Sequence, residues 1–291
     1  MNGAVFGFDS AIHLAVAFLA ATIAGVANAI AGGGTVVAFP ALVWLGLPYV
    51  AANATNSVAL WPGSVSAAWS YHGRLRSMRR LWFWLGLVPV ALAGGAFGAW
   101  LLIRMPPAWF RGVAPFLVVG ASIAVAIEPM VRARLATRRG AGSAPPARRS
   151  RTRPRSQRTA ARTAYRASAP AEGAAVRAGP AALGLFGVSL YGGYFGAGIG
   201  ILMLLLFGGV GVDSLHDANA LKNAFAAVMK VSALVYFVAI GAVVWPAAIV
   251  MAVGAAAGGY LGGRLIQRVD ERVMRGVVVA IGVALGLALL A

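Results

Sequence analysis

The chain has 291 residues, of which 60% are hydrophobic and 11% are charged, and its 25 Lys and Arg against 7 Asp and Glu give a net charge of +18. A soluble domain is nearer half apolar and a quarter charged, so the composition indicates an all-α polytopic membrane protein. The absence of Cys and the three scattered His exclude disulfides, thiol catalysis and Cys-ligated metals, predict no cofactor, and together with the few carboxylates favour transport over catalysis.

Eight stretches are long and apolar enough to form membrane elements. Two of them are interrupted by glycines, at residues 11–47 and 180–212. The other six are 50–71, 81–103, 112–130, 215–240, 243–263 and 273–291. The first apolar run ends at Ala27-Asn28-Ala29, which resembles a secretory cleavage site, but the residues ahead of it carry Asp9 and no Lys or Arg. We therefore predict a retained membrane segment there.

An Arg-rich segment separates the two groups of membrane elements. Residues 131–179 hold 13 Arg and one Glu without an apolar period, which predicts a disordered cytoplasmic linker between transmembrane repeats at 1–130 and 180–291. The alternative is an arm that binds RNA or anionic lipid. Because Tyr165 is its single aromatic residue, we expect no nucleic-acid partner, and we expect deletion of 140–170 to spare transport.

The segments on either side of this linker resemble each other at nearly constant spacing, which predicts two homologous halves of about four membrane elements each. Four pairs of strings match, at offsets of 166, 166, 164 and 164: Ala31-Gly32-Gly33-Gly34 with Ala197-Gly198-Ile199-Gly200, Ala52-Asn53-Ala54 with Ala218-Asn219-Ala220, Ala93-Gly94-Gly95 with Ala257-Gly258-Gly259, and Arg111-Gly112-Val113 with Arg275-Gly276-Val277. Duplicated halves with broken helices are frequent in transporters.

The positions of the arginines favour an inverted orientation of the two halves. Residues 72–80 and the linker are basic and should be cytoplasmic, whereas in the second half 264–275 is basic and 240–246 is uncharged. This placement requires each glycine-broken region to enter and leave the membrane by the same face. Parallel repeats with a cytoplasmic C-terminus remain the alternative.

The two glycine breaks are candidate binding elements. Unwound backbone at membrane depth survives only where protein or a watery cavity satisfies it, and the half-helices that begin after each break present N–H groups suited to an anion. The candidate residues are Gly32, Gly33, Gly34, Thr35, Gly198 and Gly200. The alternative is close helix packing through small residues, which we favour for Gly94, Gly95, Gly98, Gly258, Gly259 and Gly262.

The apolar stretch 215–240 contains both lysines of the chain. Asn219, Lys222, Asn223 and Lys230 lie at i, i+3, i+4 and i+11, along one helical stripe. Intramembrane charge is costly and usually functional, so both lysines are candidate anion ligands. The alternatives are snorkelling, or pairing with Asp213, Asp217 or Glu128. The aligned positions of the first half are polar and uncharged, and of these Asn53 and Asn56 join the predicted site, with interhelical hydrogen bonding as the alternative.

These strings resemble the sulfite exporter TauE/SafE family over everything except the linker. The likeness rests on Ala31-Gly32-Gly33-Gly34-Thr35 with Pro40, Gly46 and Ala52, on the run Tyr191-Gly192-Gly193-Tyr194-Phe195-Gly196-Ala197-Gly198-Ile199-Gly200, on Asp213 and Ala218-Asn219-Ala220-Leu221-Lys222-Asn223, and on Trp245-Pro246 and Gly258-Gly259-Tyr260-Leu261-Gly262. The resemblance implies a bacterial cytoplasmic-membrane carrier that exports sulfite, organosulfonates or related small anions by using an electrochemical gradient.

We therefore expect an inner-membrane carrier that moves a small sulfur-containing or carboxylate anion by alternating access. Its partners would be that anion, the lipid bilayer and a coupling proton or ion. Two rival functions use the same residues: a passive anion channel, and a membrane-embedded enzyme that acts on a lipid phosphate and for which no convincing base or metal site is found.

Overall fold

The computed structural model describes residues 11–31, 33–78, 80–140, 178–212, 214–265 and 271–290. These residues form helices, and none of them is in a strand, which confirms the all-helical prediction. Four helical stretches are long and apolar enough to cross a membrane, at Ala11–Asn28, Leu81–Arg104, Pro107–Val131 and His216–Ala239. Shorter apolar helices accompany them, so the chain is a multi-pass membrane protein.

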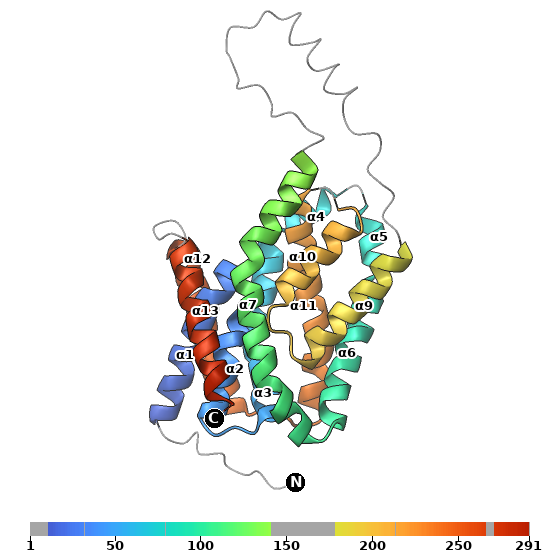
Figure 1. Ribbon diagram of the computed structural model, residues 1–291. Coiled ribbons are helices and arrows are strands. Elements are labelled where there is room, and N and C mark those ends of the chain that lie inside the picture. Colours follow the sequence, from blue (N-terminus) through green and yellow to red (C-terminus); the bar gives the residue numbers. More distant parts are fainter. Residues whose placement is uncertain are drawn as a thin grey trace, which may run out of the picture.

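The first half begins with a helical hairpin. Helix α1 (Ala11–Ala31) crosses the bundle, and α2 (Gly34–Trp44) returns to the end from which α1 started (Figure 1). With 11 residues α2 is about 16 Å long, roughly half of a hydrocarbon core. Helix α3 (Tyr49–Ser70) then crosses to the opposite end, where the short helices α4 (His72–Arg76) and α5 (Leu81–Gly86) lie.

Two long helices complete this half. Helix α6 (Val88–Arg104) returns, and α7 (Pro107–Gly140) crosses again toward the Arg-rich segment. We call the end of the bundle with α4 and the close of α7 the linker end, and the other end the distal end. Helix α7 continues ten residues into the segment predicted as linker, because the apolar run 112–130 is followed by good helix formers; residues 141–177 lie outside the described residues.

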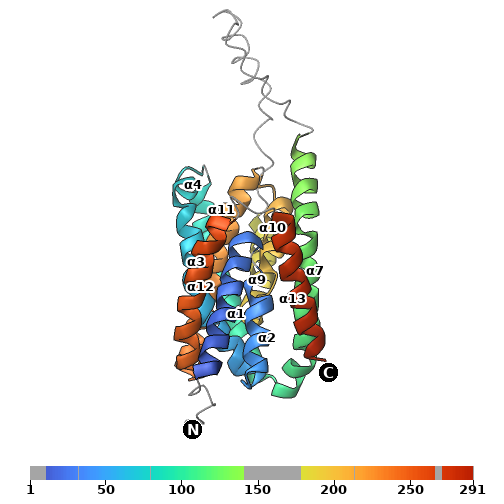
Figure 2. The ribbon, with the colours of Figure 1, turned by 90° about the vertical axis from the view of Figure 1, so that its left-hand side faces the viewer.

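The helices after the Arg-rich segment begin at the linker end. Helix α9 (Ala178–Tyr194) descends from the linker end and α10 (Ile199–Gly209) returns to it, after which α11 (Leu215–Ala239) crosses to the distal end (Figure 1). Helix α12 (Trp245–Leu265) rises and α13 (Glu271–Ala288) descends, so the start of α1 and the end of α13 lie at the same end (Figure 2). Each glycine-broken region thus enters and leaves by one end, the course required by the inverted alternative.

Glycines let helices of different halves touch through their backbones. Helix α1 packs along α12 and α6 packs along α9. A Cβ atom on Gly98 would overlap the carbonyl oxygen of Leu190, and one on Gly258 would overlap that of Thr22. The packing interpretation of these two glycines is therefore confirmed. The many small residues of α1 and α9 allow this close approach, and the resulting contacts hold both helices in the bundle.

We expect Gly98→Ala to lower the melting temperature of the detergent-purified protein, because the added methyl group forces α6 away from α9 at a cost of about 1 to 3 kcal/mol. Gly112→Ala is the matched control, since a Cβ there meets nothing within 4 Å. Thermal unfolding of both variants followed by circular dichroism checks this. Equal melting temperatures for the two variants would contradict the packing role of Gly98.

An ion pair joins α7 to α13 inside the bundle. Arg275 donates from Nη1 to Glu128 Oε2 at 2.5 Å and to the carbonyl oxygen of Val125 at 3.1 Å. The two charged side chains are 6% and 0% exposed. Val125 and Val278 also flank Gly33, where a Cβ would lie 2.9 Å from a methyl group of Val125. The ion pair therefore lies about one helical turn from the first glycine break.

Candidate anion-binding site

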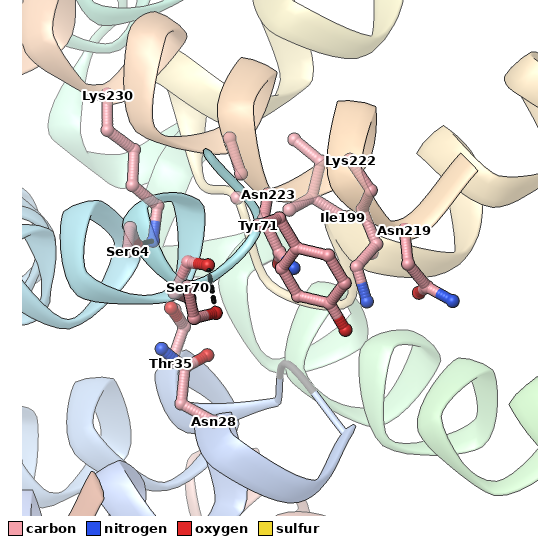
Figure 3. A pocket seen from close by; sticks show the side chains of 14 residues that line it. Asn28, Thr35, Ser64, Ser70, Tyr71, Ile199, Asn219, Lys222, Asn223 and Lys230 are labelled. Atoms are coloured by element: carbon pink, nitrogen blue, oxygen red, sulfur yellow. Dashed lines mark hydrogen bonds between the residues drawn. The ribbon is translucent and has the colours of Figure 1, made fainter. Parts of the chain in front are cut away.

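A polar cavity of about 330 Å³ lies between the two glycine breaks and the linker-end halves of α3 and α11 (Figure 3). This volume is at the lower end of the roughly 300–1,000 Å³ found for small-molecule pockets. Fourteen residues line it: Asn28, Thr35, Ser64, Ala67, Ser70, Tyr71, Gly196, Ile199, Gly200, Asn219, Lys222, Asn223, Ala226 and Lys230. The lining includes two lysines and no carboxylate, so the described cavity is electropositive.

The α11 wall carries the polar stripe that the sequence predicts. The side chains of Asn219, Lys222 and Asn223 point into the same space (Figure 3). Helical spacing places them within one turn, and Ser214 caps the start of α11 by accepting a hydrogen bond from the backbone N–H of Asp217. The sequence stripe thus becomes a single wall of the cavity.

Lys222 lies against the start of α10. A Cβ added to Gly200 would be 3.6 Å from Cδ and 3.9 Å from Nζ of this lysine. Gly198, which precedes α10, has φ +67°, a conformation that glycine adopts without strain. The second break therefore brings a lysine and the free N–H groups of a helix N-terminus to one place, as an anion requires.

Lys230 lines the cavity about two helical turns beyond Lys222 along α11. Its Nζ donates to Ser64 Oγ of α3 at 3.4 Å, and the side chain is partly buried (Figure 3). Of the carboxylates considered as alternative partners, Asp217 pairs with Arg74 at 2.5 Å, Glu128 pairs with Arg275, and Asp213 lies outside the described residues. The observed partner of Lys230 is thus a neutral hydroxyl group.

The residues predicted from the first half divide between two places. Thr35, at the start of α2, lines the cavity, whereas Gly33 and Gly34 pack against neighbouring helices; Gly32 lies outside the described residues. Asn53 and Asn56 are 0% and 1% exposed in the distal half of α3 and do not line the cavity. Asn53 donates to the carbonyl oxygen of Tyr194 at 2.9 Å.

The glycine Gly198 is also absent from the cavity lining, because its position faces Ala121 of α7. Of the predicted residues, the structure thus brings Thr35, Gly200, Asn219, Lys222, Asn223 and Lys230 together. The prediction missed the other lining residues, which are Asn28, Ser64, Ala67, Ser70, Tyr71, Gly196, Ile199 and Ala226. One signal could have found Ser64, since it precedes Lys230 by the repeat offset of 166 residues.

The distal side of the site is filled by aromatic rings from both halves. Phe39, Tyr49, Phe110, Tyr194 and Phe195 form this aromatic cluster, with centroid distances of 5.1 Å for Phe39–Phe195 and 5.5 Å for Phe110–Tyr194. Phe39, Phe110 and Phe195 are 0–2% exposed. In the other direction the cavity reaches Ser70 and Tyr71, at the linker end of α3.

Two helical hairpins whose breaks line one cationic cavity, within a multi-pass bundle, are a frequent arrangement in membrane transport proteins. The chain belongs to the sulfite exporter TauE/SafE family, whose family model matches residues 17–289. The family prediction is confirmed.

Two curated relatives carry similar descriptions. The "Probable membrane transporter protein ORF9" of a Sinorhizobium species is 32% identical over 126 residues, 42% of this chain and 46% of that protein. The "Probable membrane transporter protein" of Haemophilus influenzae is 33% identical over 116 residues, 40% of this chain and 45% of that protein. The matches thus span just under half the length of these relatives. No solved structure matches the chain significantly.

Proposed function

We propose that this protein is a secondary carrier that exports a small anion, such as sulfite, an organosulfonate or a related carboxylate, across the bacterial cytoplasmic membrane. The observation that carries the proposal is the placement of Lys222 and Lys230, with no carboxylate in the lining, beside the N-terminus of α10. Two ammonium groups and helix N–H groups suit an oxyanion. The name of the family supplies sulfite as the first anion to test.

Each part of the cavity has a role in this proposal. Lys222 and Lys230 neutralise the anion, and the amides of Asn219 and Asn223 orient it. The hydroxyl groups of Thr35 and Ser64 donate further hydrogen bonds to its oxygens. A small tetrahedral or pyramidal oxyanion fits within about 330 Å³ and leaves room for an organic substituent or water.

We assign the linker end to the cytoplasm. Arg74, Arg76 and Arg80 lie at this end, and short basic loops stay on the cytoplasmic side. The cavity reaches the same end, so the anion enters from the cytoplasm in the state described here.

The proposal includes inverted repeats related by a two-fold axis in the membrane plane. It is supported by the matched helix pairs, since α1 packs on α12 as α9 packs on α6, and α2 packs on α3 as α10 packs on α11. It is also supported by two hydrogen bonds between residues 166 apart, Trp61 Nε1 to the carbonyl oxygen of Ala227 at 3.3 Å and Lys230 to Ser64. Residues near a two-fold axis contact their own equivalents in this way.

The aromatic cluster favours a carrier over a channel. With its rings packed edge to face, this cluster closes the distal side while the cavity reaches the linker end. A channel needs a path that is open at both ends at once, whereas alternating access needs one closed end in each state.

Flux in proteoliposomes tests the proposal. Radiolabelled sulfite and an organosulfonate are supplied separately, with and without an imposed pH gradient, and the initial rate is measured against concentration. We expect saturable flux, stimulated by unlabelled anion on the opposite side. Fast flux that rises linearly with concentration and shows no counter-exchange would support the channel instead, and no flux of any small anion would contradict the proposal.

A further inference from the structure

Lys230 lies where the two halves meet. It contacts Ser64, the residue 166 positions earlier, and one turn away Trp61 contacts Ala227 at the same separation. Helices α3 and α11 run antiparallel and pack together at this point (Figure 1). If the halves are related by a two-fold axis, that axis passes close to the Lys230 ammonium group, which then belongs equally to both sides of the molecule.

Away from this crossing, equivalent residues of the two halves have different surroundings. Asn219 and Lys222 line the cavity on the linker side. Their equivalents at the same offset, Asn53 and Asn56, lie in the distal half of α3 and are 0% and 1% exposed. The Oδ1 atom of each of these two amides accepts no hydrogen bond. A buried amide oxygen without a donor is costly and rare, so it requires an explanation.

The aromatic cluster lies beside Asn53, the first of these two amides. Asn53 donates to the backbone of Tyr194, whose ring packs on Phe110, and the adjacent Phe195 packs on Phe39. The rings come from α2, α3 and α7, from the last residue of α9 and from the residue that follows it, so they lie on both sides of the Arg-rich segment. A relative movement of the halves would separate the rings and bring water or an anion to Asn53 and Asn56.

We propose that Asn53 and Asn56 line the anion site in a second state that is open at the distal end, with Lys230 shared by both states. This inference rests on the proposed carrier function and specifies how its site changes. An anion that enters from the linker end then contacts both Lys222 and Lys230. An anion that enters from the distal end contacts only Lys230, because Asn56 takes the place of Lys222 in that state. The linker face therefore binds the anion more tightly than the distal face.

Substitutions that exchange the residue types at positions 222 and 56 test this inference. The half-saturating sulfite concentration is measured separately for each face, in inside-out and right-side-out membrane vesicles. In the natural sequence we expect the half-saturating concentration at the linker face to be lower by about tenfold. The reason is that one extra ammonium group near the anion strengthens binding there. Lys222→Asn should raise the linker-face value, Asn56→Lys should lower the distal-face value, and the double variant should reverse the asymmetry.

The inference is overturned if Lys222→Asn raises both values equally, or if Asn56→Lys acts at the linker face. Absence of flux of sulfite, of an organosulfonate and of a carboxylate in the natural sequence would instead remove the proposed function, so the two failures are distinguishable. Because Asn56 is buried here, Asn56→Lys could fail to fold, and a smaller substitution provides an independent measurement.

The chain contains no cysteine, so Asn56→Cys can be labelled selectively. During exchange of an organosulfonate, which unlike sulfite does not add to maleimides, we expect a membrane-impermeant maleimide to modify it when added at the distal face. Lys222→Cys should react from the linker face. Labelling of residue 56 from the linker face, or no labelling of it while Lys222→Cys reacts and exchange proceeds, would overturn the inference.

Discussion

Lys230→Met is expected to reduce the second-order rate constant of sulfite transport by about 30- to 150-fold. The substitution keeps much of the side-chain volume but removes the ammonium group that contacts Ser64 between α3 and α11. Two unit charges 4 Å apart attract by about 4 kcal/mol at an effective dielectric constant near 20. Since the side chain is only partly buried, we discount this to roughly 2 to 3 kcal/mol, which corresponds to the stated range.

The initial rate of labelled sulfite uptake into proteoliposomes, at concentrations far below saturation, measures this effect. Val235→Met is the matched control, because it introduces the same side chain in the same helix. Val235 is 58% exposed and lies away from the cavity lining. Lys230→Arg should retain part of the activity, since the positive charge remains but the guanidinium group differs in shape from the ammonium group. A Lys230→Met protein that transports as fast as the control would show that this lysine has no role in anion binding.

Arg275→Met is expected to destabilise the protein by about 3 to 5 kcal/mol. Glu128 is fully buried, and the substitution removes the guanidinium group that pairs with it. A buried carboxylate that loses its partner retains its desolvation cost without the compensating attraction. The carbonyl oxygen of Val125 also loses the donor that Arg275 supplies, which adds to the loss next to the first glycine break.

Chemical or thermal unfolding in detergent checks this expectation, with Arg111→Met as the control. Arg111 is the residue that matches Arg275 in the repeat alignment, but it is exposed, so its loss should change the melting temperature little. The double variant Glu128→Met, Arg275→Met should recover much of the stability, because both buried charges are then absent. Equal melting temperatures for Arg275→Met and Arg111→Met would contradict a structural role for the ion pair.

Much of the site could be predicted because its signals are local. Lys222, Asn223 and Lys230 lie within one helix, so the helical period alone places them on one face. Both glycine breaks could be located for the same reason, since an interrupted apolar run shows where a membrane helix ends. The hairpins α1–α2 and α9–α10 follow from these breaks.

Contacts between distant segments could not be predicted in this way. Glu128 and Arg275 are 147 residues apart. The sequence allows Glu128 as a partner of Lys230, but Lys230 contacts Ser64 instead. Asn28 and Tyr71 carry no local pattern that distinguishes them from structural or interfacial residues, yet both line the cavity. Their selection depends on how α1 and α3 cross.

The sequence by itself determined that this is a helical membrane protein with two glycine-broken apolar regions, that both of its lysines lie on one helix, and that it resembles the TauE/SafE family. These properties depend on composition, periodicity and spacing. Only the tertiary structure decided that Asn219 and Lys222 line a cavity while Asn53 and Asn56 are buried inside the bundle. The reason is physical: similar local sequences have similar local preferences, so which of them faces the cavity depends on how the helices pack against each other.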